Sequence, residues 1–371
     1  MKYLSEVQID RTALQQNATN LAVSHAVTFA VVKSNAYGHG IDVAVECLDG
    51  NVHGFAVDDF DELVAVRAIS SKPTLVLGYV ACHQVEEAIR LDGELAVYDV
   101  RRLKAIAEAG ARLEKRPRIH LKIDALLGRQ GLLPEELPHF IAQLRSFPQI
   151  ELVAAYSHFG NIEDTTDLTH AQDQTNAFSK AFEVLKQSGW PNIARHESAT
   201  SAVMVHESPR IGNCLVRLGV GIYGLYPSAP LSRSHQSLNL QPVMRWVSHL
   251  AQVKRLPAKH PVGYGLTYVT SKETLIGIVP QGYSDGYDRG LSNCGEVLVH
   301  GVRCPVLGRI AMNMFAIDLT PVPHAQQEDE VVLLGSQGDD TITAEEIAQK
   351  IGTINYEVVA RVSPLLPRTV V

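Results

Sequence analysis

Basic side chains recur in this sequence at the ends of short apolar segments, where they could bind an anionic ligand. The stretch AVVKSNAYGHG, residues 30–40, ends an apolar run on Lys33 and continues into small, polar and glycine residues. A lysine at the end of a strand is usually a solvated terminus. Lys122, Arg129 and Arg217 hold comparable positions further along the chain, and His158 follows another apolar segment. Convergence of these groups at one place would favour a functional site over a set of solvated ends.

The chemistry that these residues suggest is imine formation beside a phosphate group. A lysine amine forms an imine with a carbonyl compound. Arg217 lies in LVRLGVG, where Gly219 and Gly221 allow the backbone to approach a ligand closely. In parallel barrels, the loops after the seventh and eighth strands commonly hold phosphate. An imine-forming lysine beside a phosphate site therefore predicts pyridoxal 5'-phosphate as the cofactor.

The segment RIHLKID, residues 118–124, indicates what surrounds Lys122. Strand alternation places His120, Lys122 and Asp124 on one face and the apolar residues on the other. In a barrel wrapped by helices the apolar set faces the helices, so Lys122 should point inward, near Arg129. Two cations in a dry interior repel unless they are compensated. We expect either that Asp124 pairs with one of them or that Lys122 is modified.

The elements that must position these residues alternate between short apolar runs and amphipathic stretches. Eight apolar runs separated by helical patterns predict a parallel (β/α)8 barrel, with catalytic groups at the carboxyl ends of its strands. An open doubly wound sheet is the alternative, but no GxGxxG or Walker motif follows any strand. The predicted strands are residues 28–33, 54–57, 74–77, 94–98, 118–124, 151–157, 193–197 and 215–218. The predicted helices include residues 59–69, 86–91, 100–109, 134–144 and 171–187.

The pattern changes near residues 227–241, where PSAPLSRSHQSLNLQ is rich in proline and serine and is typical of a linker. The runs beyond it are short and bounded by turns, which predicts a mostly antiparallel β domain with one helix near residues 343–351. We expect a barrel over residues 1–232 and a β domain over residues 233–371. The second domain contains three motifs rich in glycine or polar residues, GYGLTY at 263–268, GYSDGY at 282–287 and GRIAMNM at 308–314.

Composition narrows the class of protein. The 371 residues carry a formal net charge of −7 and a pI of about 6.1, which argues against a nucleic-acid partner. No apolar run approaches the roughly 20 residues that a membrane span needs. The N-terminal MKYLSEVQID is unlike a signal peptide, so we expect a cytoplasmic protein. The five scattered cysteines suit reduced thiols, and we expect no disulfide framework and no metal site.

Taken together, these motifs resemble the alanine racemase family over nearly the whole chain. AVVKSNAYGHG is similar to the family's cofactor-lysine signature, and HLKID with Gly128-Arg129, SHF, VRLGVGIYG, GYGLTY, GYSDG and GRIAMN follow in the family's order. The resemblance implies an isomerase that interconverts L- and D-alanine and supplies D-alanine for peptidoglycan. It also implies a homodimer whose active sites lie at the subunit interface, with the β domain of one chain completing the site of the other.

The resemblance also implies roles for individual residues. Lys33 would hold the cofactor and act as one base, with Tyr264 as the other. The remaining implied roles are cofactor contacts from Arg217 at the pyridine nitrogen, His158 beside Arg217 or Tyr264, Arg129 at the O3′ side and the substrate carboxylate, and Tyr37, Thr200, Gly219 and Val220 at the phosphate. On the substrate side, the implied residues are Met312 and Asn313, with Tyr283 at the entrance. In many members the counterpart of Lys122 is carbamylated, which would relieve the repulsion inferred above.

The chain departs from the family's pattern at several positions. Ala125-Leu126-Leu127 replaces the usual Thr-Gly-Met, and Asn313 replaces an Asp near the amino-acid pocket, which leaves serine or a broader range of amino acids as alternative substrates. Two other functions remain open, one enzymatic and one not. An amino-acid decarboxylase of the same barrel class usually has a cysteine acid on its second domain, whereas Tyr264 and Met312 stand there in this chain. A non-enzymatic protein that binds pyridoxal phosphate would be essentially a barrel alone.

Overall fold

The computed structural model describes residues 3–163, 166–205 and 214–371 and divides the chain into two compact units. The barrel unit comprises Thr12–Ser34 and Ala44–Gln241, and the β unit comprises Met1–Arg11, Asn35–Val43 and Pro242–Val371. The division expected at residue 232 placed both N-terminal segments in the barrel. The structure differs because residues 6–9 form a strand that pairs with β10 (Met244–His249) and β20 (Arg368–Val370) of the β unit.

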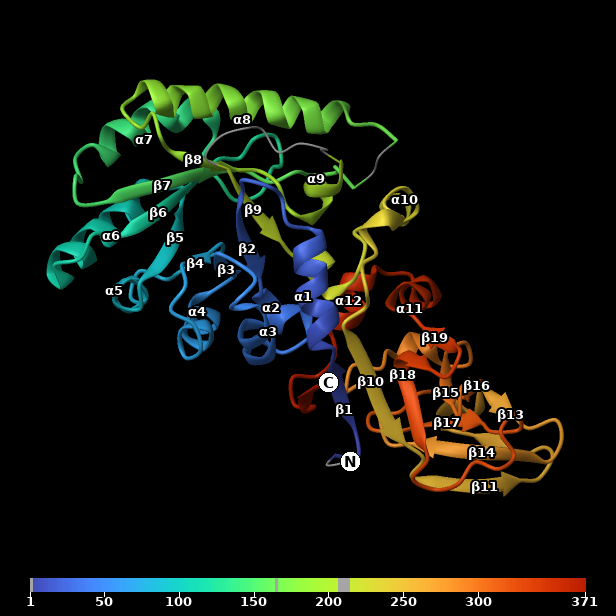
Figure 1. The fold of residues 1–371 in the computed structure, drawn as a ribbon. Coiled ribbons are helices and arrows are strands. Elements are labelled where there is room, and N and C mark those ends of the chain that lie inside the picture. Colours follow the sequence, from blue (N-terminus) through green and yellow to red (C-terminus); the bar gives the residue numbers. More distant parts are fainter. Residues whose placement is uncertain (1–2, 164–165, 206–213) are drawn as a thin grey trace. The chain divides into compact units, whose positions relative to one another are not determined.

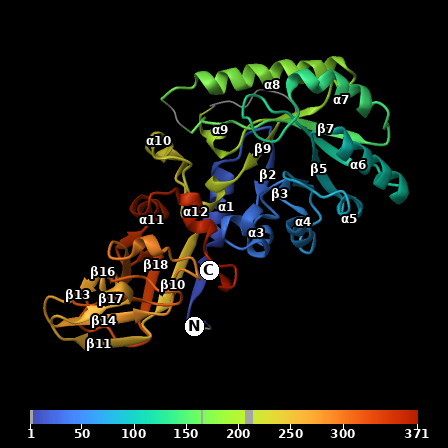
Figure 2. The ribbon, with the colours of Figure 1, turned by 180° about the vertical axis from the view of Figure 1, so that it is seen from behind.

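The barrel unit is built on an eight-stranded parallel sheet in the order β8-β7-β6-β5-β4-β3-β2-β9 (Figures 1 and 2). Isolated parallel bridges join Arg195 to Cys214 and Ala199 to Arg217, beside the two end strands, so the sheet is nearly closed. The predicted (β/α)8 fold class is confirmed. The strands are β2 (Val27–Val31), β3 (Gly54–Val57), β4 (Thr74–Val76), β5 (Gly93–Val97), β6 (Arg118–Lys122), β7 (Glu151–Tyr156), β8 (Ala194–His196) and β9 (Leu215–Leu218).

Helices separate most of these strands, and side-chain caps fix where several of them begin. Asp59 and Asp99 lie just before α4 and α6, and their carboxylates accept the backbone N–H groups of Glu62 and Arg102. The helices and 3-10 turns up to residue 241 are α1 (Arg11–Asn20), α2 (Lys33–Tyr37), α3 (Ile41–Leu48), α4 (Phe60–Arg67), α5 (Val85–Arg90), α6 (Val100–Leu113), η1 (Pro134–Glu136), α7 (Leu137–Leu144), α8 (Thr169–Gln187), α9 (Thr200–Val205), η2 (Val220–Tyr223), α10 (Ala229–Ser234) and η3 (Gln236–Leu238).

The β unit contains a second, mostly antiparallel sheet in the order β11-β14-β17-β16-β15-β18-β10-β1-β20, with β19 paired to β18. This arrangement confirms the predicted class of the second domain. Its strands are β1 (Glu6–Ile9), β10 (Met244–His249), β11 (Gln252–Leu256), β14 (Thr274–Val279), β15 (Glu296–Val299), β16 (Val302–Leu307), β17 (Phe315–Asp318), β18 (Glu330–Gln337), β19 (Asp340–Ile342) and β20 (Arg368–Val370). The smaller elements are β12 (Pro261–Val262), η4 (Tyr264–Leu266), β13 (Tyr268–Val269), η5 (Arg289–Leu291), α11 (Ala344–Ile351) and α12 (Asn355–Ala360).

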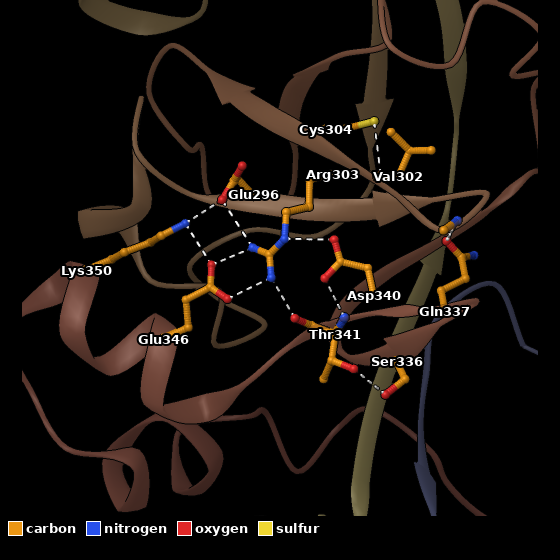
Figure 3. Close-up of polar contacts among 11 residues, drawn as sticks. Glu296, Val302, Arg303, Cys304, Ser336, Gln337, Asp340, Thr341, Glu346 and Lys350 are labelled. Carbon is orange, nitrogen blue, oxygen red and sulfur yellow. Dashed lines mark hydrogen bonds and ion pairs between the residues drawn. The ribbon is translucent and has the colours of Figure 1, made fainter. Parts of the chain in front are cut away.

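A network of charges centred on Arg303 fastens α11 to this sheet (Figure 3). The Arg303 guanidinium donates to Asp340 at 2.9 Å, to Glu296 at 3.2 Å and to Glu346 at 2.7 Å. Lys350 contacts Glu296 at 2.8 Å and Glu346 at 3.0 Å. The hydrogen bond from Arg303, together with the other nearby cation, lowers the pKa of Glu346 despite its partial burial. The network therefore joins three carboxylates to two cations across β15, β16, β19 and α11.

Two regions differ from the sequence-based expectation. The segment 227–241, expected as a linker, contains α10 and η3 and belongs to the barrel unit. Its helix forms because the Ser228 hydroxyl accepts the backbone N–H of Leu231 and so caps the first turn. A second helix, α12, follows α11, where one helix was expected. Within the ranges that the structure describes, no helix combines the length and the apolar character needed to cross a membrane.

Candidate active site

Four cations from different elements meet at the carboxyl end of the barrel strands. Lys122 ends β6, Arg217 lies on β9, Lys33 follows β2 after one residue, and Arg129 lies in the loop after β6. Burial, and then the charges of Arg129, Arg217 and Lys33, lower the pKa of Lys122 to about 8. These groups therefore lie close enough to act on one another. The convergence expected from the strand ends is present within the barrel unit.

Lys33 is half-buried, and its amine contacts a carboxylate that the sequence analysis did not select. Lys33 Nζ lies 3.3 Å from Oδ1 of Asp58, which directly follows β3. The backbone N–H groups of Ser34 and Asp58 both donate to the carboxylate of Glu62, at 2.5 and 2.8 Å. These bonds join the loops that follow β2 and β3, beside the Lys33 amine. The rule that pointed to Lys33, a polar residue directly after a strand, would also have found Asp58.

The helix that Lys33 begins is left-handed over most of its length. Ser34, Asn35, Ala36 and Tyr37 all have φ between 53° and 54°, although none of them is glycine. A left-handed turn of this kind costs roughly 1–2 kcal/mol per residue, because Cβ crowds the following carbonyl. The Asn35 side chain offsets part of that cost by accepting the backbone N–H of Ile41 at 2.9 Å. Strain of this kind at the loop after Lys33 is typical of functional sites.

Lys122 is buried, and the acceptor of its amine is not Asp124. Its Nζ donates to Gln130 Oε1 at 2.9 Å and lies 5.6 Å from the centroid of the Tyr156 ring. Asp124, the partner expected from the sequence, instead accepts the backbone N–H groups of Leu127, Gly128 and Arg129 at 2.9–3.1 Å. The expected Lys122–Asp124 pair was thus wrong, because the carboxylate caps its own loop.

Arg217 is only 3% exposed and is held by the ends of neighbouring strands. Nη1 donates to the carbonyl of His196 at 2.9 Å and also contacts the His196 ring, while Nη2 donates to the carbonyl of Ser157 at 2.9 Å. The guanidinium also lies over the Tyr156 ring, 5.2 Å from its centroid. Nη2 also contacts the carbonyl of Glu197 at 3.4 Å, so within the described residues each of the four N–H groups on the terminal nitrogens has an acceptor. The Nε–H group is therefore the donor left for a ligand.

His196, not His158, is the histidine that hydrogen-bonds to Arg217. His196 is fully buried at the end of β8, and its ring stacks on Tyr156 at a centroid distance of 4.6 Å. The residue at which the sequence pointed, His158, is half-buried, and its pKa falls to about 3 through burial and the charges of Arg217 and Arg129. His158 therefore stays neutral near the same cations. The sequence carried a signal for His196 as well, since it also ends a predicted strand.

The expected phosphate residues of the barrel unit lie at two short helical turns. Thr200 begins α9 and Val220 begins η2. The Thr200 hydroxyl accepts the backbone N–H of Gly219 at 3.0 Å, which joins the loops after β8 and β9. A Cβ at Gly221 would lie 2.5 Å from Cγ2 of Thr200, so glycine is needed for this approach. At Gly221, the close contact within the protein is therefore with Thr200.

Tyr37 belongs to the β unit together with the glycine that follows it. Its ring centroid lies 6.2 Å from that of Tyr356 on α12. Gly38 has φ of +84°, and a Cβ there would lie 1.9 Å from the carbonyl oxygen of Val359. Arg368 donates to the carbonyl of Gly38 at 2.7 and 3.2 Å. These contacts hold Tyr37 within the β unit.

The other expected residues of the β unit lie on three segments, η4 and the loops around Tyr283 and Met312. Tyr264 is 73% exposed in η4, between Gly263 and Gly265, whose φ values are +71° and +72°. Met312 and Tyr283 are also exposed, and Asn313 donates to the Ser284 hydroxyl at 2.8 Å. The Ser284 hydroxyl in turn donates to the carbonyl of Met312 at 2.8 Å, which joins their two loops. The β unit thus presents a phenol and a thioether to its surroundings.

The barrel residues fit the cofactor that the sequence predicted. Lys33, Lys122, Arg129 and Arg217 gather cationic charge, while the Asp124 carboxylate is occupied by backbone donors. The cations at the carboxyl end of the barrel strands favour an anionic ligand, and a phosphate ester with a phenolate oxygen is such a ligand. Lys33 offers a half-exposed primary amine, and Arg217 offers its Nε–H. This set of donors and the amine match pyridoxal 5'-phosphate.

Comparison with known proteins identifies the family. The family models described as "Alanine racemase, N-terminal domain" and "Alanine racemase, C-terminal domain" match residues 9–227 and 243–370. The chain belongs to the alanine racemase family. Alanine racemase from Leptospira interrogans is 32% identical over 379 residues, which cover 100% of this chain and 96% of that protein. These matches confirm the resemblance that the motifs indicated.

Solved structures give the same result. Alanine racemase from D-cycloserine-producing Streptomyces lavendulae has a TM-score of 0.92 at 30% identity and covers 100% of this chain and 98% of its own. Alanine racemase from Bacillus anthracis with bound L-Ala-P has a TM-score of 0.91 at 31% identity and covers 100% of this chain and 96% of its own. Because both domains of the family match, the comparisons argue against a barrel-only cofactor-binding protein, and the relatives' names argue against a decarboxylase.

Proposed function

We propose that this protein is an alanine racemase that interconverts L- and D-alanine with pyridoxal 5'-phosphate bound at the mouth of its barrel. The observation that carries the proposal is the group of cations around Lys33 and Arg217, in a chain whose two domains both match the family. The product would be D-alanine for peptidoglycan, made in the cytoplasm. The matched relatives, which are named for alanine, favour alanine over serine as the substrate.

In this proposal the barrel residues hold the cofactor. Once its contact with Asp58 opens, Lys33 would hold the cofactor covalently through Nζ. An arriving amino acid would take the place of Nζ on the cofactor, which frees the Lys33 amine to act as a base. Arg217 donates through Nε–H toward the ring nitrogen and, because a guanidinium keeps its proton, leaves that nitrogen unprotonated. The cofactor's contribution, when bound, is to withdraw electrons from the α-carbon of the attached amino acid. The proposed phosphate contacts are Tyr37, Thr200, Gly219 and Val220, with His158 beside the same cations.

Two bases on opposite faces of the amino acid would then move the α-proton. Lys33 Nζ removes or returns it on one face, and Tyr264 Oη does so on the other. Arg129 binds the substrate carboxylate and the O3′ side of the cofactor. Met312 and Asn313 bound the amino-acid pocket, and Tyr283 lies at its entrance. Tyr264 and Met312 are exposed on their own chain, which supports the proposal that these loops of the β unit complete the active site of a partner subunit.

We also propose that Lys122 is carbamylated. With its pKa lowered to about 8, roughly a tenth of the amine is neutral at pH 7, far more than for an ordinary lysine, and the neutral amine is the form that reacts with carbon dioxide. The resulting carbamate carries a negative charge among Arg129, Arg217 and Lys33. Charge compensation by this modification would replace the aspartate pair that the structure lacks at Lys122.

The experiment is a racemase assay on the purified protein with added pyridoxal 5'-phosphate. We expect L-alanine to yield D-alanine, detected with a D-amino-acid oxidase, without release of carbon dioxide. Borohydride reduction followed by peptide mapping should place the cofactor on Lys33, and Lys33→Ala should lose both label and activity, while Lys104→Ala on the exposed face of α6 keeps both. Label on another lysine, or faster turnover of serine than of alanine, would contradict the proposal.

A further inference from the structure

A line of buried polar side chains crosses the interior of the barrel behind Arg217. His196 on β8 contacts Arg217 through Nδ1, and its Nε2 lies 2.9 Å from Nδ1 of His120 on β6. Nε2 of His120 lies 2.7 Å from Oε2 of Glu94 on β5. Glu94, His120 and His196 are each at most 1% exposed. The line thus joins strands at β5, β6, β8 and β9 without reaching solvent.

The chemistry of the groups fixes the direction of every hydrogen bond in this line. A guanidinium only donates, so Nδ1 of His196 must accept from Arg217 and carry no proton. The neutral ring then has its proton on Nε2, which donates to Nδ1 of His120. His120 in turn carries its proton on Nε2 and donates it to Glu94. The line therefore runs from a permanent cation through two neutral histidines to a carboxylate.

The surroundings keep both ends charged and the middle neutral. Burial and the charge of Arg217 lower the pKa of His196 well below its ordinary value. Burial alone would raise the pKa of Glu94, but the hydrogen bond from His120 and the charge of Arg118 lower it overall. Arg118 forms an ion pair with the second oxygen of Glu94. Glu94 thus remains a carboxylate that accepts from His120.

We infer that Glu94 is a positioning residue for Arg217 and acts on it through His120 and His196. The carboxylate selects the Nε2–H tautomer of both rings, and this tautomer turns the Nδ1 lone pair of His196 toward the guanidinium. Arg217 is thereby fixed with both terminal nitrogens bound to protein and Nε–H directed to the ligand. The kinetic consequence rests on the proposed function, whereas the tautomers can be measured without cofactor or substrate.

The first test is nitrogen NMR of the imidazole rings in the cofactor-free protein labelled with ¹⁵N-histidine. His120→Gln and His196→Gln variants assign the two signals. We expect both rings to be neutral Nε2–H tautomers, and we expect Glu94→Gln to shift the signals of both. Either ring found charged or protonated on Nδ1 in the unmodified protein would overturn the inference, even if the Glu94 variant did not fold.

The second test measures turnover in Glu94→Gln against a matched control. Glu330→Gln also removes the charge of a carboxylate paired with an arginine, Arg245, but Glu330 lies in the β unit and is not part of the line. We expect Glu94→Gln to lower kcat about tenfold with little change in KM. A tenfold loss is at the lower end of the range that follows from removing an outer hydrogen-bond partner. The control should change neither kcat nor KM. An unchanged kcat would overturn the inference. If the unmodified protein had no racemase activity, the proposed function would be overturned. The imidazole signals would still show whether the line from Glu94 to Arg217 has the inferred tautomers.

Discussion

At the scale of single residues, the site depends on how cations are compensated in a space with little water. Asp58 contacts Lys33, Gln130 contacts Lys122, and His196 contacts Arg217. Two of these three partners are neutral, so a net positive charge remains at the mouth. That charge stabilises an anionic ligand, and it also makes each buried cation costly to the folded protein.

The cost at Lys122 leads to a prediction on pH. Its folded pKa of about 8 lies below the ordinary 10.5, so between these values the unfolded chain binds a proton that the folded chain lacks. Stability therefore rises with pH from about 8 to 10.5, and below pH 8 the full penalty applies. In buffer free of bicarbonate, Lys122→Met should be more stable than the unmodified protein at pH 7, by up to about 3 kcal/mol, and the difference should shrink toward pH 10. Urea unfolding measures this.

Bicarbonate separates the bare amine from the carbamate in the same experiment. If carbamylation compensates the cations, added bicarbonate should stabilise the unmodified protein and leave Lys122→Met unchanged. A mass increment on the peptide that contains Lys122 would support the assignment. Equal stability of the two proteins at pH 7 without bicarbonate would contradict the buried-cation argument.

The exposed phenol of Tyr264 gives a second prediction at this scale. Tyr264→Phe removes one hydroxyl from a side chain that is 73% exposed, so the unfolding free energy should change by less than about 0.5 kcal/mol. The loss of a base should lower kcat by about 10²- to 10⁴-fold. Tyr79→Phe, at a tyrosine that is also exposed and has no proposed role in the site, is the matched control and should retain most of the turnover. Normal racemisation by Tyr264→Phe would exclude this residue as a base.

At the scale of elements, the left-handed helix α2 runs from Lys33 in the barrel unit into the segment Asn35–Val43, which belongs to the β unit. Four consecutive residues other than glycine hold φ near +53° there, a conformation that the sequence does not favour. Asn35 and Gly38 supply the two local compensations, a side-chain bond to Ile41 and a backbone contact that tolerates no Cβ. The element therefore keeps its shape because its surroundings require it.

Because α2 is strained, we expect a glycine substitution there to raise the free energy of unfolding, whereas glycine in a helix usually lowers it. Ser34→Gly should stabilise the protein by about 0.5 to 1 kcal/mol, because relief of the left-handed conformation exceeds the added entropy of the unfolded chain. Ser34 is exposed, so no burial is lost. Ala111→Gly, at an exposed position of the right-handed helix α6, should instead destabilise by about 1 kcal/mol. Equilibrium unfolding in urea compares them, and the same sign for both would refute the interpretation.

At the scale of the whole molecule, the proposed bases belong to different compact units. Lys33 lies in the barrel unit and Tyr264 in the β unit. In the proposed homodimer, each active site combines Lys33 of one chain with Tyr264 of the other, and a closed two-fold interface forms this combination twice. The exposed loops around Tyr264 and Met312 support such an exchange, because they present large side chains that are not buried within their own chain.

Subunit mixing tests the dimer and the bases together. Lys33→Ala and Tyr264→Ala should each be nearly inactive. After random exchange about half of the dimers are mixed, and one of the two sites in each mixed dimer has both groups, so activity should recover to roughly a quarter of the unmodified value. Mass spectrometry of the intact dimers confirms that exchange has occurred. Activity that stays at the level of the single variants would place both groups in one chain.

The sequence by itself determined the fold class and the family, because both depend on local patterns. Apolar runs alternating with helical stretches predicted the barrel, and turn-bounded runs predicted the antiparallel domain. Polar residues at strand ends identified Lys33, Lys122 and Arg217, since parallel strands bring their carboxyl ends to one mouth. The motifs, in order along the chain, indicated alanine racemase, and the family models match the same ranges.

Only the tertiary structure decided which side chains pair with one another. The sequence offered Asp124 to Lys122 and His158 to Arg217, whereas Asp124 caps its own loop and His196 takes the place beside Arg217. Glu94 stands 123 positions before Arg217 in the sequence, and no local pattern links them. Periodicity tells which face a side chain occupies, but closure of the barrel decides which strands' side chains meet inside it, and that contact fixes the charge and tautomer of each group.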